Sequence, residues 1–150
     1  MVRFFLISLL LAVPGISGCG NDWSSGPCDN ADAAGYTTLE HDGVTREYVL
    51  SVPDSYASDT PVPLVIAFHG NGGCATDFND DLSSMAEAND FIVAYPQGVV
   101  RGKGAAEWNP ANSGTENIND NDVFFTEQLI SAISADYNID STRVYAVGYS

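Results

Sequence analysis

Three short, continuous apolar runs constrain the fold of this chain more than any other feature. They are Leu64–Phe68, Phe91–Tyr95 and Arg143–Val147, of which the last begins with a single charged residue before four apolar ones. Each has the length of one β-strand and lacks polar alternation, which is the pattern of a strand covered on both faces. Two segments with helical spacing separate them, at about Asp77–Asn89 and Asp122–Tyr137. This alternation predicts an α/β fold, with a mostly parallel sheet and helices packed on both of its faces.

The flanking segments indicate where the domain begins and which helix face is buried. Tyr36–Glu40 and Val44–Val52 are rich in β-forming residues and flank Asp42-Gly43, which favours a hairpin. Residues 19–35 are small, polar and turn-prone, and we interpret them as a tether. In the second predicted helix, we expect the buried stripe to consist of Val123, Ile130, Ile133 and Tyr137.

Residues 1–18 have the pattern of an export signal. Arg3 precedes an apolar run from Phe4 to Val13, which is far shorter than the roughly 20 residues that a membrane span needs. We therefore expect an exported protein, located outside the cell or in the cell envelope. Ile16-Ser17-Gly18-Cys19 resembles a bacterial lipobox, in which Cys19 would carry the lipid. The alternative is an ordinary signal peptide that is cleaved nearby, with Cys19 a plain thiol.

Charge and cysteine content restrict the possible partners. The formal net charge of −15 repels nucleic-acid phosphates and anionic lipid, which excludes nucleic-acid binding and leaves a lipid anchor as the membrane contact. In an oxidising compartment Cys28 and Cys74 are candidates for a disulfide. Two unpaired thiols are the alternative. The sequence indicates no oligomeric state.

The last apolar run leads into Gly148-Tyr149-Ser150, the first three positions of a Gly-x-Ser-x-Gly nucleophile elbow. In that motif the strand turns sharply and lifts the serine hydroxyl toward a histidine and an oxyanion hole. We therefore predict that Ser150 is a catalytic nucleophile. A serine that only caps a helix is the alternative.

A glycine-rich turn follows the first apolar run, with the sequence His69-Gly70-Asn71-Gly72-Gly73. Backbone N–H groups in such a turn can stabilise a developing oxyanion. We predict that Asn71 supplies the N–H group and that Gly70 and Gly72 give room for its approach. His69 opens this turn and precedes the serine, so we interpret its ring as structural. His41, in the hairpin, is expected to be peripheral.

The expected catalytic triad is incomplete within these residues. In chain order the serine of such hydrolases comes first, followed by the acid and then the histidine. We therefore expect the acid and the histidine to lie beyond Ser150, and residues 36–150 to be the N-terminal part of a catalytic domain, truncated after the nucleophile strand. Alone it would be inactive, with an open strand edge and exposed apolar surface.

Five blocks of sequence together resemble the secreted polyhydroxybutyrate depolymerase and feruloyl esterase family. They are Pro63–Gly70, Ala94–Gly98, Trp108-Asn109, Asn121–Phe125 and Asp140–Ser150. The resemblance implies an α/β-hydrolase that cleaves carboxylic esters, such as polyesters or feruloylated polysaccharides, without a metal or cofactor. It places the nucleophile at Ser150 and the oxyanion turn at His69–Gly73.

Two further assignments stay open at this point. Trp108 and Asn109 are candidates for substrate contact, since an indole ring suits an aromatic acyl group, but packing of the loop explains Trp108 equally well. The oxygen-rich segment Glu116–Asp122 lacks EF-hand spacing, and we interpret Asp120 or Asn121 as a helix cap and no residue as a metal ligand. A non-catalytic exported binding module and a serine peptidase of the same fold are the competing functions.

Overall fold

The structure is a computed structural model that describes residues 35–41, 43–101, 105–109 and 121–150. The predicted signal peptide, most of the tether, Cys19 and Cys28 lie outside the described residues. None of the helices in the described part is long and apolar enough to cross a membrane.

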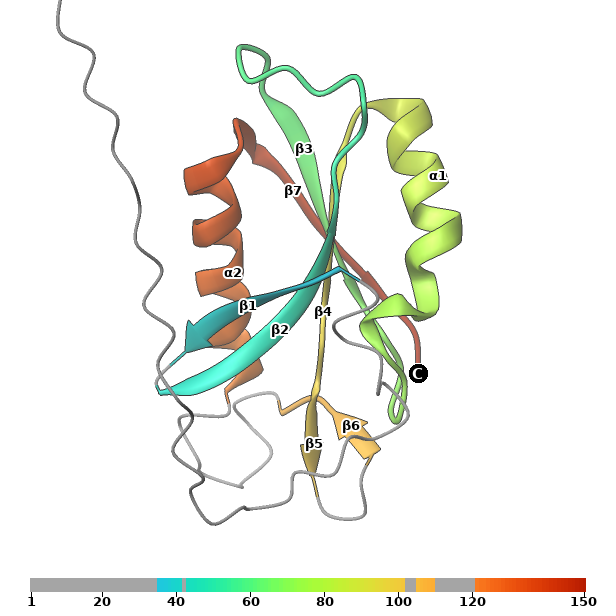
Figure 1. The fold of residues 1–150 in the computed structure, drawn as a ribbon, viewed down its shortest axis with the longest axis vertical. Coiled ribbons are helices and arrows are strands. Elements are labelled where there is room, and N and C mark those ends of the chain that lie inside the picture. The colour runs from blue at the N-terminus through green and yellow to red at the C-terminus, as the bar shows by residue number, and fades with distance from the viewer. Residues whose placement is uncertain (1–34, 42, 102–104, 110–120) are drawn as a thin grey trace, which may run out of the picture.

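A five-stranded mixed sheet forms the centre of the molecule, in the order β1-β2-β4-β3-β7 (Figure 1). The strands are β1 (Tyr36–His41), β2 (Val44–Ser51), β3 (Val62–Phe68), β4 (Ile92–Pro96) and β7 (Ile139–Gly148). β1 and β2 form the predicted antiparallel hairpin, and β2 also runs antiparallel to β4. β3 is parallel to both β4 and β7, so the sequence-based expectation of a parallel centre is confirmed.

Two helices cover opposite faces of this sheet (Figure 1). A 3-10 turn, Ala75–Phe78, leads into α1 (Asn79–Asn89) on one face, and α2 (Asp122–Asp136) lies on the other. A separate two-stranded ribbon consists of β5 (Val99–Arg101) and β6 (Ala105–Glu107). The core accordingly has two parts. One lies between the sheet and α2 around Leu64, Ile66 and Phe125, and the other lies on the α1 side around Val93, Tyr95 and Ala86.

The buried face of α2 differs from the predicted stripe. Asp122, Phe125, Leu129 and Ile133 are buried, whereas Val123 is 47% exposed. The prediction was wrong at Val123 because Asp122 pairs with a buried arginine, Arg46, and this pair turns the face that carries Asp122 toward the sheet. The predicted cap is confirmed: the Asn121 side chain accepts from the N–H groups of Val123 and Phe124.

His41 is not peripheral, so the expectation for this residue was wrong. Its side chain is buried, its Nδ1 lies 2.5 Å from Oε1 of Gln128, and its ring centroid lies 6.0 Å from that of Phe125. Both contacts are with α2, because β1 crosses the start of that helix (Figure 1). Hairpin position in the sequence does not reveal such a contact.

β7 is exposed, although its sequence predicted a strand covered on both faces. In the described residues it pairs with β3 along one edge only. Tyr145 is 55% exposed and Val147 40% exposed, while Val144 on the opposite face packs against the α2 side of the core. The open strand edge and the exposed apolar surface that we expected are therefore present.

Candidate active site

The end of β7 has one backbone feature that the predicted nucleophile elbow requires. Ser150 adopts φ 55°, a left-handed conformation that non-glycine residues rarely occupy. Glycine is favoured at position 148, because a Cβ there would lie 3.1 Å from the Phe68 carbonyl oxygen and 3.2 Å from the Phe68 Cβ, which is closer than most such contacts. The first glycine of the motif thus allows β7 to approach the end of β3. Ser150 follows two residues later, at the carboxyl edge of the parallel strands.

The glycine turn after β3 contacts this elbow directly. A Cβ on Gly70 would lie 3.2 Å from both the Ser150 Cβ and the Tyr149 carbonyl oxygen. The Asn71 N–H group donates to the Ser150 carbonyl oxygen at 3.4 Å. The two sequence motifs, although about 80 residues apart in the chain, are therefore in van der Waals contact.

The hydrogen bonds of the turn distinguish its amides. Gly72 N–H donates to the Ala106 carbonyl at 2.8 Å, and Gly73 N–H donates to the Gly70 carbonyl at 2.9 Å. Both bonds have the ordinary length of an N–H···O hydrogen bond, whereas the bond from Asn71, at 3.4 Å, is long and therefore weak. The Asn71 amide is therefore the one of these three that turns most readily toward a substrate oxygen. Gly72 has φ 76°, so the turn also needs glycine for its backbone shape.

His69 fixes the turn and is not available as a base. Its ring is 2% exposed, with Nδ1 2.7 Å from the Gly70 carbonyl oxygen and Nε2 accepting from Gly98 N–H at 2.9 Å. Burial lowers the pKa of His69, because the charged imidazolium loses hydration there. A neutral ring with both nitrogens engaged has no lone pair free for a serine hydroxyl. The structural interpretation of His69 is confirmed.

Trp108 packs against the first residue of this turn and also borders a pocket. Its Nε1–H donates to the His69 carbonyl at 2.8 Å, and its ring centroid lies 4.7 Å from that of His69 and 5.1 Å from that of Phe68. A mainly apolar pocket of about 420 Å³ is lined by Phe68, Trp108, Asp122, Val123, Thr126 and Glu127. Trp108 therefore packs against His69 and Phe68 and also lines a cavity. Its contact with substrate stays a prediction.

Asn109 lies in the interior, 5% exposed, and does not line that pocket. Its N–H group donates to the Asp122 carboxylate, and its carbonyl accepts from Asp122 N–H at 3.1 Å. This reciprocal pair joins the β6 side of the site to the first residue of α2. The position favours a structural role for Asn109 over substrate contact.

Comparison with known proteins supports the same architecture. The structure resembles acetyl xylan esterase from Aspergillus awamori with a TM-score of 0.58 at 20% sequence identity, over 75% of this chain and 42% of that one. No family model matches the sequence. In sequence, the whole chain is similar to "Probable feruloyl esterase C" of Aspergillus niger, with 28% identity over 153 residues that make up 53% of that protein.

The protein of the same name from Aspergillus oryzae is 31% identical over 108 residues, which are 70% of this chain and 37% of that protein. The chain belongs to an esterase family of the α/β-hydrolase type. The predicted fold is therefore confirmed. The chain spans about half the length of these family members or less.

Sequence reasoning missed two buried polar residues that connect β2, α2 and the glycine turn. Arg46 is 3% exposed and pairs with Asp122, and Gln97 is 8% exposed and contacts His69. The period-two alternation of the hairpin already places Arg46 on the same face as Tyr48 and Leu50, which indicates an inward arginine. For Gln97 the available signal was its place directly after Tyr95-Pro96, at the carboxyl end of a buried strand.

Cys74 lies at the end of the glycine turn and is disulfide-bonded. Its predicted partner, Cys28, is outside the described residues, so the pairing stays a prediction. A crosslink at this place would restrict the end of the turn, whereas His69 holds its start.

Proposed function

We propose that the protein is a serine-dependent carboxylic ester hydrolase in which Ser150 is the nucleophile. One observation carries the proposal: Ser150 has a left-handed backbone and its Cβ lies against Gly70, with the Asn71 amide beside it. A serine that only capped a helix would need neither the strained backbone nor a glycine turn packed on it.

In the proposed reaction the Ser150 hydroxyl oxygen attacks the ester carbonyl carbon and forms a tetrahedral intermediate. The Asn71 N–H group donates to the oxyanion, and a single donor of this kind contributes roughly 10²–10³ in kcat. The alcohol then leaves, and water releases the acyl group from the serine. A histidine and an acid, expected beyond Ser150 in the chain, would accept and return the serine proton.

We propose an ester of a polysaccharide or a polyester as the substrate. Relatives in sequence carry the name feruloyl esterase, and a structural relative is named acetyl xylan esterase. The apolar pocket beside Phe68 and Trp108 has aromatic walls and is large enough for an aromatic acyl group. These observations support an aromatic carboxylate as the acyl part.

A fluorophosphonate probe and aryl esters test the proposal on the complete protein. We expect labelling and ester hydrolysis that are lost in Ser150→Ala and kept in Ser134→Ala, a matched serine on the exposed side of α2. Labelling that persists in Ser150→Ala would refute the assignment of the nucleophile. A wild type that neither reacts nor hydrolyses esters would indicate a binding module, and faster cleavage of amides than of esters would indicate a peptidase.

A further inference from the structure

We infer that Gln97 is a positioning residue for the oxyanion turn: its side-chain amide joins His69, which opens the turn, to Ala75, which lies just beyond its end, and so fixes Asn71 against Ser150. The inference rests on the proposed function, because it concerns the same oxyanion donor. It adds a residue on a different strand end, which contacts neither the serine nor the proposed substrate pocket.

The orientation of the Gln97 amide follows from its partners. Oε1 lies 2.9 Å from the Ala75 backbone nitrogen and 3.2 Å from the Tyr36 hydroxyl. A backbone N–H group can only donate, so the atom facing Ala75 must be the oxygen. The Nε2 group then faces the other way, 3.3 Å from Nε2 of His69 and 3.3 Å from the Gly98 carbonyl oxygen.

This orientation determines the state of the His69 ring. Two N–H donors, from Gly98 at 2.9 Å and from Gln97 at 3.3 Å, face Nε2 of His69. Nε2 must therefore be an unprotonated acceptor, and the ring hydrogen must be on Nδ1, where it donates to the Gly70 carbonyl. Gly70 immediately precedes Asn71, so Gln97 acts on the oxyanion donor through one ring and one carbonyl.

Gln97 is itself anchored to a part of the molecule outside the turn. Its N–H group donates to the Glu47 carbonyl at 2.8 Å, and its carbonyl accepts from Nη2 of Arg46 at 3.2 Å. Both partners belong to β2, and the residue is almost fully buried. These two bonds connect the turn, through Gln97, to the central sheet, in addition to the hydrogen bonds within the turn itself.

The local charges favour an uncharged side chain at position 97. Asp77, on the 3-10 turn, and Asp122, on α2, are the charged groups that act on His69, and both favour a protonated ring. Burial is the larger effect and lowers the pKa of His69, which favours the neutral ring. A carboxylate in place of the amide would place a negative charge beside Nε2, in addition to the more general influence of Asp77 and Asp122, and would remove the hydrogen-bond donor to Nε2. Protonation of Nε2 would then displace the Gly98 N–H group and loosen the turn.

Three variants of the complete protein test this inference, with kcat and KM measured for an aryl ester from pH 5 to 9. In Gln97→Met we expect kcat to fall by about 10- to 100-fold while KM stays within twofold, because the oxyanion donor is misplaced but the substrate pocket is intact. In Gln97→Glu, which keeps the size and the acceptor, we expect an additional loss toward low pH relative to wild type. Gln128→Met is the matched control, since that glutamine contacts His41 on β1, and should retain wild-type kcat.

The outcomes separate this inference from the proposed function. If wild type is active and both Gln97 variants keep kcat within twofold at every pH, the positioning role is refuted and the esterase proposal stands. If wild type hydrolyses no ester, the proposed function fails, and backbone hydrogen exchange then decides the positioning role. We expect Ala75 N–H to exchange at least about tenfold faster in Gln97→Met, and equal exchange would overturn the inference.

Discussion

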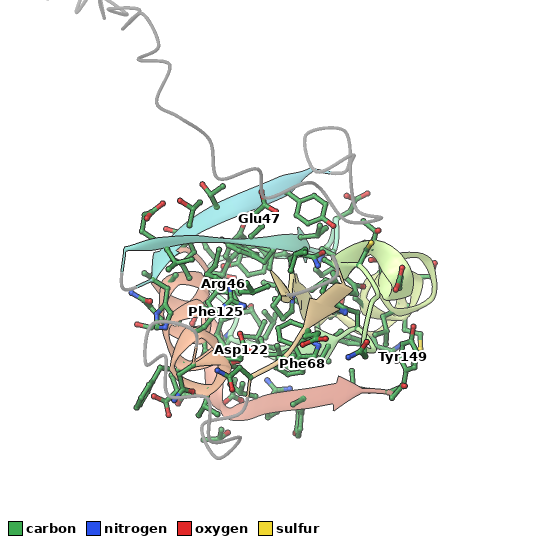
Figure 2. All side chains as sticks on the ribbon, turned by 90° about the horizontal axis from the view of Figure 1, so that it is seen from below. Arg46, Glu47, Phe68, Asp122, Phe125 and Tyr149 are labelled. Atoms are coloured by element: carbon green, nitrogen blue, oxygen red, sulfur yellow. The ribbon has the colours of Figure 1, made fainter. Side chains whose placement is uncertain are left out.

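Removal of Arg46 is the sharpest test of how the interior of this domain is held together. The side chains of Arg46 and Asp122 are 2% and 7% exposed, and Nη2 of Arg46 lies 2.7 Å from Oδ1 of Asp122. The guanidinium also lies 3.8 Å from the centre of the Phe125 ring, and Asp122 accepts from Asn109 N–H. Figure 2 shows Arg46, Phe125 and Asp122 grouped between the β1–β2 hairpin and α2.

The expected cost follows from the charge that each substitution leaves behind. Arg46→Met keeps most of the side-chain volume but leaves a buried carboxylate without its counter-ion, which typically costs about 3–5 kcal/mol. The Asn109 N–H group and the positive end of α2 still stabilise that carboxylate, the latter by roughly 0.3–1 kcal/mol, so we expect about 3 kcal/mol. Asp122→Asn should also destabilise, because it leaves a buried guanidinium.

Urea unfolding of wild type, both single variants and the double variant measures these terms. We expect the double variant to be more stable than the sum of the single effects implies, by about 2 kcal/mol, because it removes both buried charges together. Arg143→Met is the control, since the Arg143–Asp140 pair is exposed and should contribute little. A loss below about 1 kcal/mol for Arg46→Met, or strict additivity in the double variant, would refute the reasoning.

Two further predictions concern the elbow and an exposed carboxylate. Gly70→Ala should lower kcat by about tenfold or more in steady-state ester hydrolysis, because the new Cβ would lie 3.2 Å from the Ser150 Cβ and push the turn away. An unchanged kcat would show that the structure accommodates the added methyl group without moving the turn. The pKa of Asp140 is lowered to about 2 because Thr142 and Arg143 hydrogen-bond to its carboxylate. Any stabilisation from these bonds is therefore present above pH 3.8 and lost as the pH falls toward 2. A carboxyl NMR titration checks this, and a midpoint near 3.8 would contradict it.

The strands and the meeting of the two motifs could be predicted from the sequence for a simple physical reason. A continuous apolar run such as Leu64–Phe68 indicates a strand between two layers, and parallel strands end at one edge of a sheet. A glycine turn after one run and a serine after another must therefore lie near each other. The alternation of strands and helices was therefore enough to predict that Gly70 lies near Ser150.

The errors concern contacts that depend on partners distant in the chain. The face of α2 was misassigned because Asp122 reads as a polar first-turn residue until Arg46 is seen to be buried beside it. His41 was misplaced because its neighbours are on α2. The role of Gln97 depends on Tyr36 and Ala75 together, and no periodic pattern records such a set of hydrogen bonds.

The left-handed backbone at Ser150 restricts which side chains can be tried there before their chemistry is considered. A residue branched at Cβ is strongly disfavoured at φ 55°, so threonine would bring a hydroxyl group to the site only at the expense of the turn that presents it. Unbranched residues such as cysteine and aspartate tolerate that geometry better. If a different nucleophile were to evolve at this position, the backbone shape would therefore favour the thiol of cysteine or the carboxylate of aspartate.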